Sequence, residues 1–298
     1  STYQRFKVSK SVVPFLDRNN GNVALKGPIS LEAPDGLLWK GGIYSGPFSI
    51  QPDAYGSWTL VEHVSIEKYL NGVVPYEIGS NSPEAALAAQ AVLARTWAIA
   101  NIHRFKVDGY NLCSDTQCQV YKDPSKANQK IKTAIKKTAG KILTWKQRPI
   151  NTVYHATNGG VMAGVDEAWS TNPVPYLQMR LDGPKNWIRE LDLPLSNEKY
   201  LKSFLFRKSD AFGSNHPLFR WSRTLDATQV SQQLNRAKKV SGKFYPKKII
   251  VLTRGTSGRV TSLKIEGNPE SEILLELDDI RRVFRQLPST LFVVKEIK

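Results

Sequence analysis

One glutamate, Glu77, is a candidate catalytic residue because of the segment that contains it. It follows residues 73–76 and precedes Gly79, in a segment expected to connect two helices. Apolar neighbours favour the protonated form of a carboxyl group, which can act as a general acid. The positive end of the helix expected to begin at Pro83 favours the ionised form instead. The sequence leaves both open, and the alternative to catalysis is a solvated loop glutamate.

The cysteines Cys113 and Cys118 are a second candidate for chemistry. They are the two cysteines of the chain, with four residues between them, and the nearest histidine, His103, lies ten residues before Cys113. A tetrahedral zinc site needs two further ligands. In an exported protein a local disulfide is an equal alternative. A disulfide or free thiols are therefore favoured over zinc, and a nucleophilic cysteine is less expected because no partner is placed beside it.

A polar loop forms the third candidate group. His155, Thr157 and Asn158 stand directly before the pair Gly159-Gly160. Such a loop can present hydroxyl, amide and backbone N–H groups to a ligand, because glycine readily adopts positive φ. Asp166 follows this loop. The alternative for His155 is a surface position at the end of a strand.

The composition indicates a folded protein with a basic surface. The 298 residues include 42 Lys and Arg against 26 Asp and Glu, a net charge of +16, and 41% hydrophobic residues. This length favours about two domain-sized units. Residues 199–298 hold 20 basic and 9 acidic side chains. The excess suggests a polyanionic partner, namely nucleic acid, an anionic membrane surface or an acidic polysaccharide, or else only a generally basic surface.

Several function classes are excluded or disfavoured by missing patterns. The sequence has no P-loop, dinucleotide-binding glycine motif, zincin motif or nucleophile elbow. Nothing therefore indicates a nucleotide cofactor or serine hydrolase chemistry. No uncharged apolar run approaches the roughly 18 residues of a membrane-spanning helix.

The N-terminal half is expected to pass from strands to helices. Glycine and proline recur between short β-type segments, such as 22–25 and 57–61, which predicts a β-rich lobe over residues 1–64. A short helix is predicted from an N-cap at Ser65 to about residue 71. The segment that follows is expected to be extended, because the residue before Pro75 disfavours helix. Ser82 is the expected N-cap of a long Ala-rich helix that runs to about residue 105.

The remaining elements are predicted from periodicity and turn residues. A Lys-rich helix is expected over residues 125–138, closed by Gly140, followed by strands at 141–145 and 149–155. Residues 170–190 are expected to form loops. The C-terminal part is expected to contain helices at 227–239 and 277–285 and strands at 248–254, 259–266 and 291–295.

In their order, these segments resemble the SpoIID family, which includes stage II sporulation protein D and the LytB amidase enhancers. The resemblance extends over about residues 20–295 and is carried by residues 69–77, 84–98, 118–121, 154–160, 169–177, 257–260 and 288–292. It implies an α+β, SpoIID-like fold with three sections. These are a β-rich lobe at 1–64, a catalytic core with a helical region and the glutamate loop at 65–190, and a basic α+β part of the same unit at 191–298.

The resemblance implies an exported protein of the cell envelope that acts on peptidoglycan glycan strands. SpoIID is a lytic transglycosylase of strands without stem peptides, and Glu77 matches its catalytic glutamate. The nucleophile is the C6 hydroxyl of the sugar itself, so no second carboxylate is needed to activate water. Further residues in matching motifs are expected around the glycan groove, with a structural ion pair as the alternative for the first: Arg95, Gln119, Tyr121, His155, Thr157, Asn158, Gly159, Gly160 and Asp166.

Two departures from the family pattern bear on function. Ala88 stands where the family often has lysine, and Gln117 stands where zinc-binding members have histidine. We therefore expect no cofactor and no zinc at Cys113 and Cys118. The competing interpretation is a non-catalytic, glycan-binding enhancer of an N-acetylmuramoyl-L-alanine amidase. Nucleic acid is not an expected partner, and the basic charge is expected to serve retention on the wall.

Overall fold

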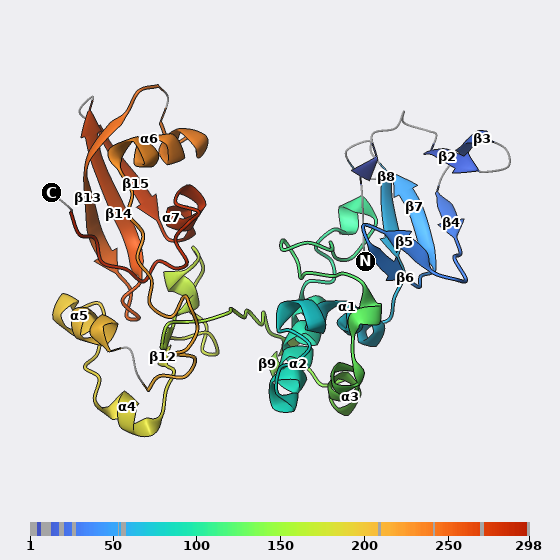
Figure 1. Ribbon diagram of the computed structural model, residues 1–298, viewed down its shortest axis with the longest axis horizontal. Helices are drawn as coiled ribbons and strands as arrows, with labels where there is room; N and C mark the ends of the chain where they lie inside the picture. Colours follow the sequence, from blue (N-terminus) through green and yellow to red (C-terminus); the bar gives the residue numbers. More distant parts are fainter. Residues whose placement is uncertain are drawn as a thin grey trace. The chain divides into compact units, whose positions relative to one another are not determined.

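The computed structural model of the chain describes residues 5–6, 13–17, 21–25, 28–52, 54, 58–207, 210–240, 242–268 and 271–296. They fall in two compact units, Ser1–Tyr154 and His155–Lys298, each described by itself (Figure 1). This division differs from the three sections expected from the sequence, because residues of the expected core 65–190 lie in both units. Ser57, the first residue of an expected strand, lies outside the described residues. Helices and small antiparallel sheets occur together, which confirms the α+β class.

The first unit begins with short antiparallel strands. One sheet has the order β1-β8-β7-β4, with β1 at Arg5–Phe6, β8 at Trp58–Glu62, β7 at Phe48–Pro52 and β4 at Ile29–Leu31. Two hairpins pair β2 (Val13–Asp17) with β3 (Gly21–Leu25) and β5 (Leu37–Trp39) with β6 (Gly42–Tyr44). Phe48, Ile50 and Leu60 are buried in the same core as the helices that follow.

Helix α1 (Ile66–Glu77) is longer than the sequence predicts, because it continues through Pro75 to Glu77. Proline in a helix interior costs about 3 kcal/mol, since it lacks the N–H donor. Val73 and Val74 are completely buried in the first-unit core, and burying two valines stabilises by roughly 3–6 kcal/mol. Packing therefore outweighs the local preference against helix, and Glu77 is the last residue of a helix, not the loop residue predicted.

The helix caps follow the predictions in part. The Ser65 side chain accepts a hydrogen bond from the third backbone N–H of α1, as expected for an N-cap. Helix α2 (Glu84–Ala100) has Pro83 at its N-cap position, so the prediction for Ser82 is wrong. The Ser82 hydroxyl instead donates to the carbonyl of Ile78 at 2.8 Å, and thereby satisfies a free carbonyl just after α1.

The rest of the first unit covers α1 and α2. Short 3₁₀ helices lie at η1 (Lys106–Asp108) and η2 (Pro124–Lys126), and α3 spans Gln129–Lys137 with Asn128 as its N-cap. The predicted Lys-rich helix is thus shorter than expected and preceded by a separate turn. A small hairpin follows, in which β9 (Thr144–Trp145) pairs with β10 (Arg148–Pro149).

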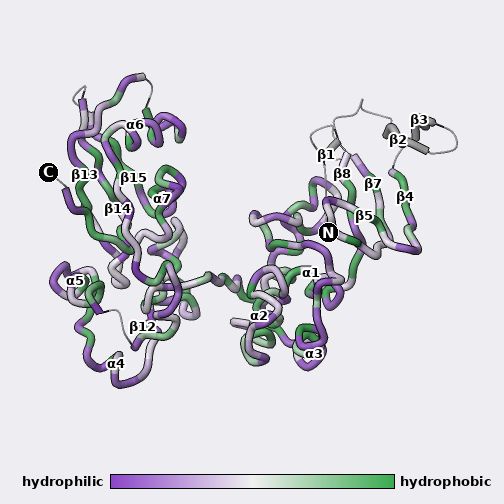
Figure 2. The backbone as a smooth tube through the Cα atoms, viewed as in Figure 1, coloured by the Kyte–Doolittle hydropathy of each residue, from purple (hydrophilic) through white to green (hydrophobic). Residues whose placement is uncertain are grey.

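The second unit contains a three-stranded antiparallel sheet, β13 (Tyr245–Arg254), β14 (Val260–Asn268) and β15 (Ser271–Glu276). Helices α6 (Ala227–Arg236) and α7 (Asp278–Val283) pack on one face of it (Figure 1). The amphipathic pattern of α6 appears as mixed colours in Figure 2, and its Val230 and Leu234 are buried in the core. The two helices and the strands β13 and β14 were predicted with shifted ends, whereas β15 was missed and the expected strand at 291–295 is not formed.

The remaining elements of the second unit surround a second hydrophobic core, distinct from the core of the three-stranded sheet. They are β11 (Val161–Met162), η3 (Val165–Glu167), β12 (Arg180–Leu181), α4 (Lys185–Arg189) and α5 (Glu198–Phe206). Trp187, Leu201 and Phe204 are buried in it. Among the described residues, no helix is both long and apolar enough to cross a bilayer.

Candidate functional site

Glu77 lies at the C-terminal end of α1 with its side chain half-buried. Its Oε1 accepts a hydrogen bond from the backbone N–H of Val120 at 2.8 Å. A backbone donor fixes the carboxyl orientation more firmly than solvent would, because the N–H cannot rotate away. The segment around Val120 therefore positions the candidate acid.

A chain of side-chain hydrogen bonds ends at a tyrosine that lies near the same carboxyl group. The Tyr69 hydroxyl donates to Gln119 Oε1 at 3.3 Å, and Gln119 Nε2 donates to the Tyr154 hydroxyl at 3.1 Å. Burial raises the pKa of Tyr154, and the charge of Glu77 and a hydrogen bond with it raise that pKa further. Tyr154 thus stays a neutral hydroxyl beside Glu77.

Gln119 is almost fully buried, and its amide links the tyrosine of α1 to the tyrosine beside Glu77. Burial also raises the pKa of Tyr69, with Tyr154 and Glu77 adding in the same direction. The structure therefore brings together Glu77, which was predicted as catalytic, and Gln119, which was predicted to bind substrate. The side-chain hydrogen bonds of Gln119 join it to Tyr69 and Tyr154.

Tyr121 points into the core and not towards a surface where a glycan would lie. Its ring stacks on Tyr69 with centroids 5.1 Å apart, and its hydroxyl donates to Glu62 Oε2 at 2.7 Å. A Cβ at Gly72 would overlap the Tyr121 ring and lie 2.6 Å from the carbonyl oxygen of Lys122. Gly72 thus allows this segment to lie directly on α1, and Tyr121 holds the neighbouring Val120 in place.

The cysteine pair lies directly before this segment. Cys113 and Cys118 are joined in a disulfide, one of the two states favoured by the sequence. The disulfide closes a short loop that ends at Cys118, next to Gln119. Among the described residues, no group of three or more His, Cys, Asp and Glu side chains is arranged to hold a metal ion.

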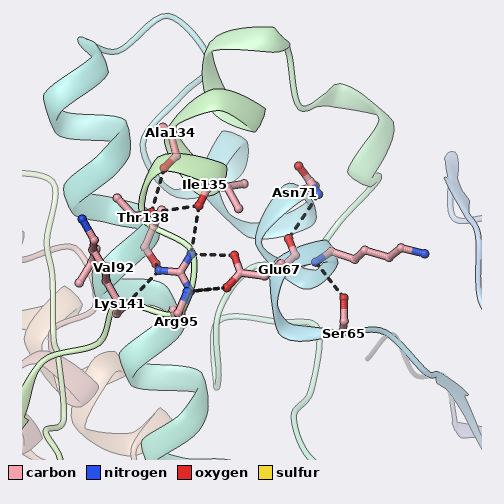
Figure 3. A network of polar contacts seen from close by, with 12 residues as sticks. Ser65, Glu67, Asn71, Val92, Arg95, Ala134, Ile135, Thr138 and Lys141 are labelled. Carbon is pink, nitrogen blue, oxygen red and sulfur yellow. Dashed lines mark hydrogen bonds and ion pairs between the residues drawn. The ribbon is translucent and has the colours of Figure 1, made fainter.

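Arg95 is buried inside the first unit, where it forms an ion pair with Glu67 of α1 (Figure 3). Its Nε and one Nη donate to the two Glu67 oxygens, each at 2.8 Å. The carbonyls of Ala91, Ile135 and Lys141 accept its remaining N–H groups. Arg95 is 1% exposed. It therefore does not line a surface groove, and the structure shows the alternative expected from the sequence, a structural ion pair.

The predicted polar loop that begins at His155 belongs to the second unit, whereas Glu77 belongs to the first. Gly159 and Gly160 have φ values of +70° and +95°, which confirms the expected left-handed backbone. Asn158 Oδ1 accepts from the Gly160 N–H at 2.8 Å, and its Nδ2 donates to Asp182 at 2.7 Å. These bonds hold the loop shape.

The other predicted residues of this loop are more open to solvent. Thr157 is half-buried, with its hydroxyl accepting from the Gly159 N–H at 3.3 Å, while His155 and Asp166 are exposed. Surrounding protein atoms lower the pKa of His155, and the positive charge of Arg259 lowers it further. His155 and Asp166 thus remain accessible, and nothing in their contacts assigns them a role.

Arg259 and Glu167 form a buried polar network beneath this loop that the sequence did not predict. Arg259 donates to the carbonyls of Asn158 at 3.3 Å and Val161 at 3.0 Å. Glu167 accepts from the backbone N–H and the hydroxyl of Ser257. Burial lowers the pKa of Arg259 to about 10. The network ties the loop to the turn between β13 and β14, and Asn158 therefore helps to hold the shape of the loop.

Tyr154 is a residue of the candidate site in the first unit that was not predicted from the sequence as a site residue. It stands directly before His155, inside a segment that carried the family resemblance. Its distance of 77 residues from Glu77 in the sequence hid their contact, since no local spacing pattern joins them. The first unit thus combines a half-buried carboxyl group, a fixed backbone donor and a neutral tyrosine, which is an arrangement for proton transfer.

Comparisons with known proteins show family similarity in two parts of the chain. Residues 54–145 match the family described as stage II sporulation protein (SpoIID), and residues 163–298 match a domain of unknown function (DUF8618). The SpoIID match covers less of the chain than the expected 20–295. Residues 54–145, which include Glu77, are thus similar to the SpoIID family, and the chain has relatives named stage II sporulation protein D and amidase enhancer.

Three relatives illustrate the similarity. An uncharacterized protein of Brachyspira hyodysenteriae is 32% identical over 155 residues, which is 50% of this chain and 40% of that protein. Stage II sporulation protein D of Bacillus amyloliquefaciens is 34% identical over 134 residues, 40% of this chain and 38% of that protein. An amidase enhancer of Bacillus subtilis is 35% identical over 113 residues, 38% of this chain and 15% of that protein. The chain thus spans well under half the length of the curated relatives it matches.

Proposed function

We propose that the chain is a peptidoglycan lytic transglycosylase of the cell envelope, with Glu77 as general acid and base. The observation that carries the proposal is the Glu77 carboxyl group, half-buried at the end of α1 inside the SpoIID match, bound by Val120 N–H at 2.8 Å. The disulfide of Cys113 and Cys118 supports an exported protein, because disulfides persist in oxidising compartments.

The reaction needs one carboxyl group and the substrate. The Glu77 carboxyl donates its proton to the glycosidic oxygen, and the bond from that oxygen to the anomeric carbon of the muramyl residue breaks. The C6 hydroxyl of the same residue then attacks the anomeric carbon and loses its proton to the Glu77 carboxylate. The products are a 1,6-anhydro-muramyl end and a new free hydroxyl, so protons balance and no water is consumed.

The neighbours of Glu77 have positioning roles in this reaction. The Val120 N–H occupies Oε1, which leaves the proton to Oε2. The Tyr154 hydroxyl is fixed by Gln119 and lies close enough to Glu77 for the carboxylate charge to raise the pKa of Tyr154. No cofactor enters any step, because the acid, the base and the nucleophile all come from Glu77 and the sugar.

A second function, a non-catalytic enhancer of an N-acetylmuramoyl-L-alanine amidase, is favoured by one comparison and one residue. The amidase enhancer of Bacillus subtilis is among the relatives. Ala88, packed against the first-unit core, stands where the family often has lysine. In this role the chain would bind glycan and present it, or itself, to the partner enzyme.

Incubation with glycan strands stripped of stem peptides separates the two functions. Mass spectrometry of the soluble products should show 1,6-anhydro-muramyl ends if the chain is the enzyme. The same protein should then be added to a purified amidase acting on intact peptidoglycan. Stimulation of the amidase without anhydro products would establish the enhancer and refute the transglycosylase.

Replacement of Tyr154 by phenylalanine is expected to lower kcat about tenfold while leaving KM nearly unchanged. The change removes a hydroxyl that Gln119 and Glu77 use, and a hydrogen bond to a charged group is worth about 1.5–3 kcal/mol. The measurement is the initial rate of anhydro product formation over a range of glycan concentrations. Tyr76→Phe is the matched control, because its hydroxyl bonds the Asp123 carbonyl instead. An equal fall in both variants would remove Tyr154 from the positioning role.

A further inference from the structure

A groove lies along the solvent face of α6 in the second unit. Residues on successive turns of the helix form one side, and Tyr245, the first residue of β13, forms the other. The hollow has a volume of about 440 Å³. Ala227, Thr228 and Ser231 are small and leave room beside Tyr245, whose side chain is 59% exposed.

A second hollow lies on the other side of the same helix, towards the end of α7. Gln232 and Arg236, one helical turn apart, line both hollows. Arg285 and Gln286 line the second one, where Gln233 Oε1 is buried without a hydrogen-bond partner among the described residues. A buried acceptor without a donor is unfavourable, so a ligand hydroxyl or N–H at this place would satisfy it.

The side chains of the two hollows suit one kind of ligand. Amides such as Gln232 and Asn235 can exchange hydrogen bonds with sugar hydroxyl and acetamido groups. The exposed face of Tyr245 can pack on the apolar face of a sugar ring. The guanidinium of Arg236 can bind a carboxylate with two parallel hydrogen bonds.

The chain segment that joins α6 to β13 beside the groove carries charge of one sign. Residues 236–248 hold six basic side chains and no acidic one. Of these, Lys239 is paired with Asp279 at 2.6 Å. A nucleic-acid groove would need basic side chains along its whole length, whereas amides and one arginine line this one. The pattern favours a polymer of sugars with spaced carboxylates.

We propose that the α6 groove binds peptidoglycan glycan through its muramyl carboxylates, as a binding site of the second unit. The proposal rests on the proposed function, because it assumes the same glycan that Glu77 would cleave. Tyr245 stacks on one sugar ring, Arg236 pairs with a lactyl carboxylate, and Gln232 bonds the acetamido groups. The site anchors the chain to the wall, and the Glu77 site carries out the chemistry.

Nuclear magnetic resonance on the isotope-labelled full chain tests this site directly. The Glu77→Gln background prevents cleavage, and the probe is a peptide-free tetrasaccharide of alternating N-acetylglucosamine and N-acetylmuramic acid. Amide signals of α6 and of Tyr245 should shift in a saturable way. The Kd read from these signals should rise about fivefold in Tyr245→Ala and about tenfold in Arg236→Gln.

Matched variants and probes give the outcomes that would overturn the proposal. Phe212→Ala removes an equally exposed aromatic ring, 58% exposed, and Lys199→Gln removes an exposed charge on α5; both should leave Kd unchanged. An uncharged N-acetylglucosamine tetramer should bind about tenfold more weakly. The proposal fails if α6 signals do not shift, if the uncharged tetramer binds equally well, or if single-stranded DNA binds there more tightly than the glycan. Absence of anhydro products from the wild-type chain, with α6 binding intact, would refute only the transglycosylase.

Discussion

Glu77→Gln is expected to reduce the formation of 1,6-anhydro-muramyl ends by at least about 100-fold. Glutamine keeps the size of the side chain and an oxygen that can accept the Val120 N–H bond. It cannot donate a proton to the glycosidic oxygen or take one from the C6 hydroxyl. The measurement is the initial rate of product formation from peptide-free glycan, quantified by mass spectrometry after digestion.

Glu84→Gln is the matched control for this experiment. Glu84 begins α2, is 58% exposed and is paired with Lys137. Its replacement removes a glutamate charge from the same unit without touching Val120 or Tyr154, so the rate should stay at the wild-type level. Circular dichroism melting of both variants establishes that they fold alike. Wild-type rates in Glu77→Gln would exclude Glu77 as the acid.

The same variant separates the two proposed functions. An enhancer needs no proton transfer, so Glu77→Gln should still stimulate a partner amidase if stimulation depends only on binding. Loss of the transglycosylase with full amidase stimulation would show that one chain carries both roles. Loss of stimulation together with the activity would mean that glycan cleavage itself exposes the substrate of the amidase.

The sequence predicted the type of most elements but not the boundary that positions the candidate site. The rule that a residue before proline avoids helix placed the end of α1 near residue 71, whereas burial of Val73 and Val74 extends it to Glu77. Helix propensity describes only local preferences, so it cannot account for packing against residues that are distant in the sequence. The loop predicted around Glu77 was therefore wrong, and the catalytic role of Glu77 stays a prediction.

Site contacts between distant residues could be predicted only where a motif marked both partners. Gln119 was marked, and the structure brings it to the neighbours of Glu77. Arg95 was marked for the same reason, but its motif position reflects the ion pair with Glu67. The β15 strand was missed even though Ile273 and Leu275 alternate with exposed neighbours, because two glutamates and a short length weakened the pattern.

Glu67→Gln is expected to lower the free energy of unfolding of the first unit by about 3 kcal/mol at neutral pH. The variant leaves the guanidinium of Arg95, which is 1% exposed, without its only carboxylate partner among the described residues. Carbonyl oxygens of Ile135 and Lys141 remain but cannot neutralise the charge. The value lies at the lower end of the usual range for a broken buried pair, since Glu67 itself is 35% exposed. Urea unfolding followed by tryptophan fluorescence measures the change.

The effect of pH distinguishes the ion pair from a simple loss of packing. Hydrogen bonds from Arg95 lower the pKa of Glu67 below its ordinary value, more than burial raises it. A carboxyl group whose pKa is lowered by folding contributes stability above its unfolded pKa and loses it as pH falls through the folded pKa. The difference between wild type and Glu67→Gln should therefore shrink when unfolding is measured at about pH 3. Glu84→Gln, which breaks an exposed pair with Lys137, should show no measurable difference at neutral pH. A difference for Glu67→Gln that stays constant from neutral to acid pH would mean that packing around α1, and not the charge on Glu67, holds Arg95 in the core.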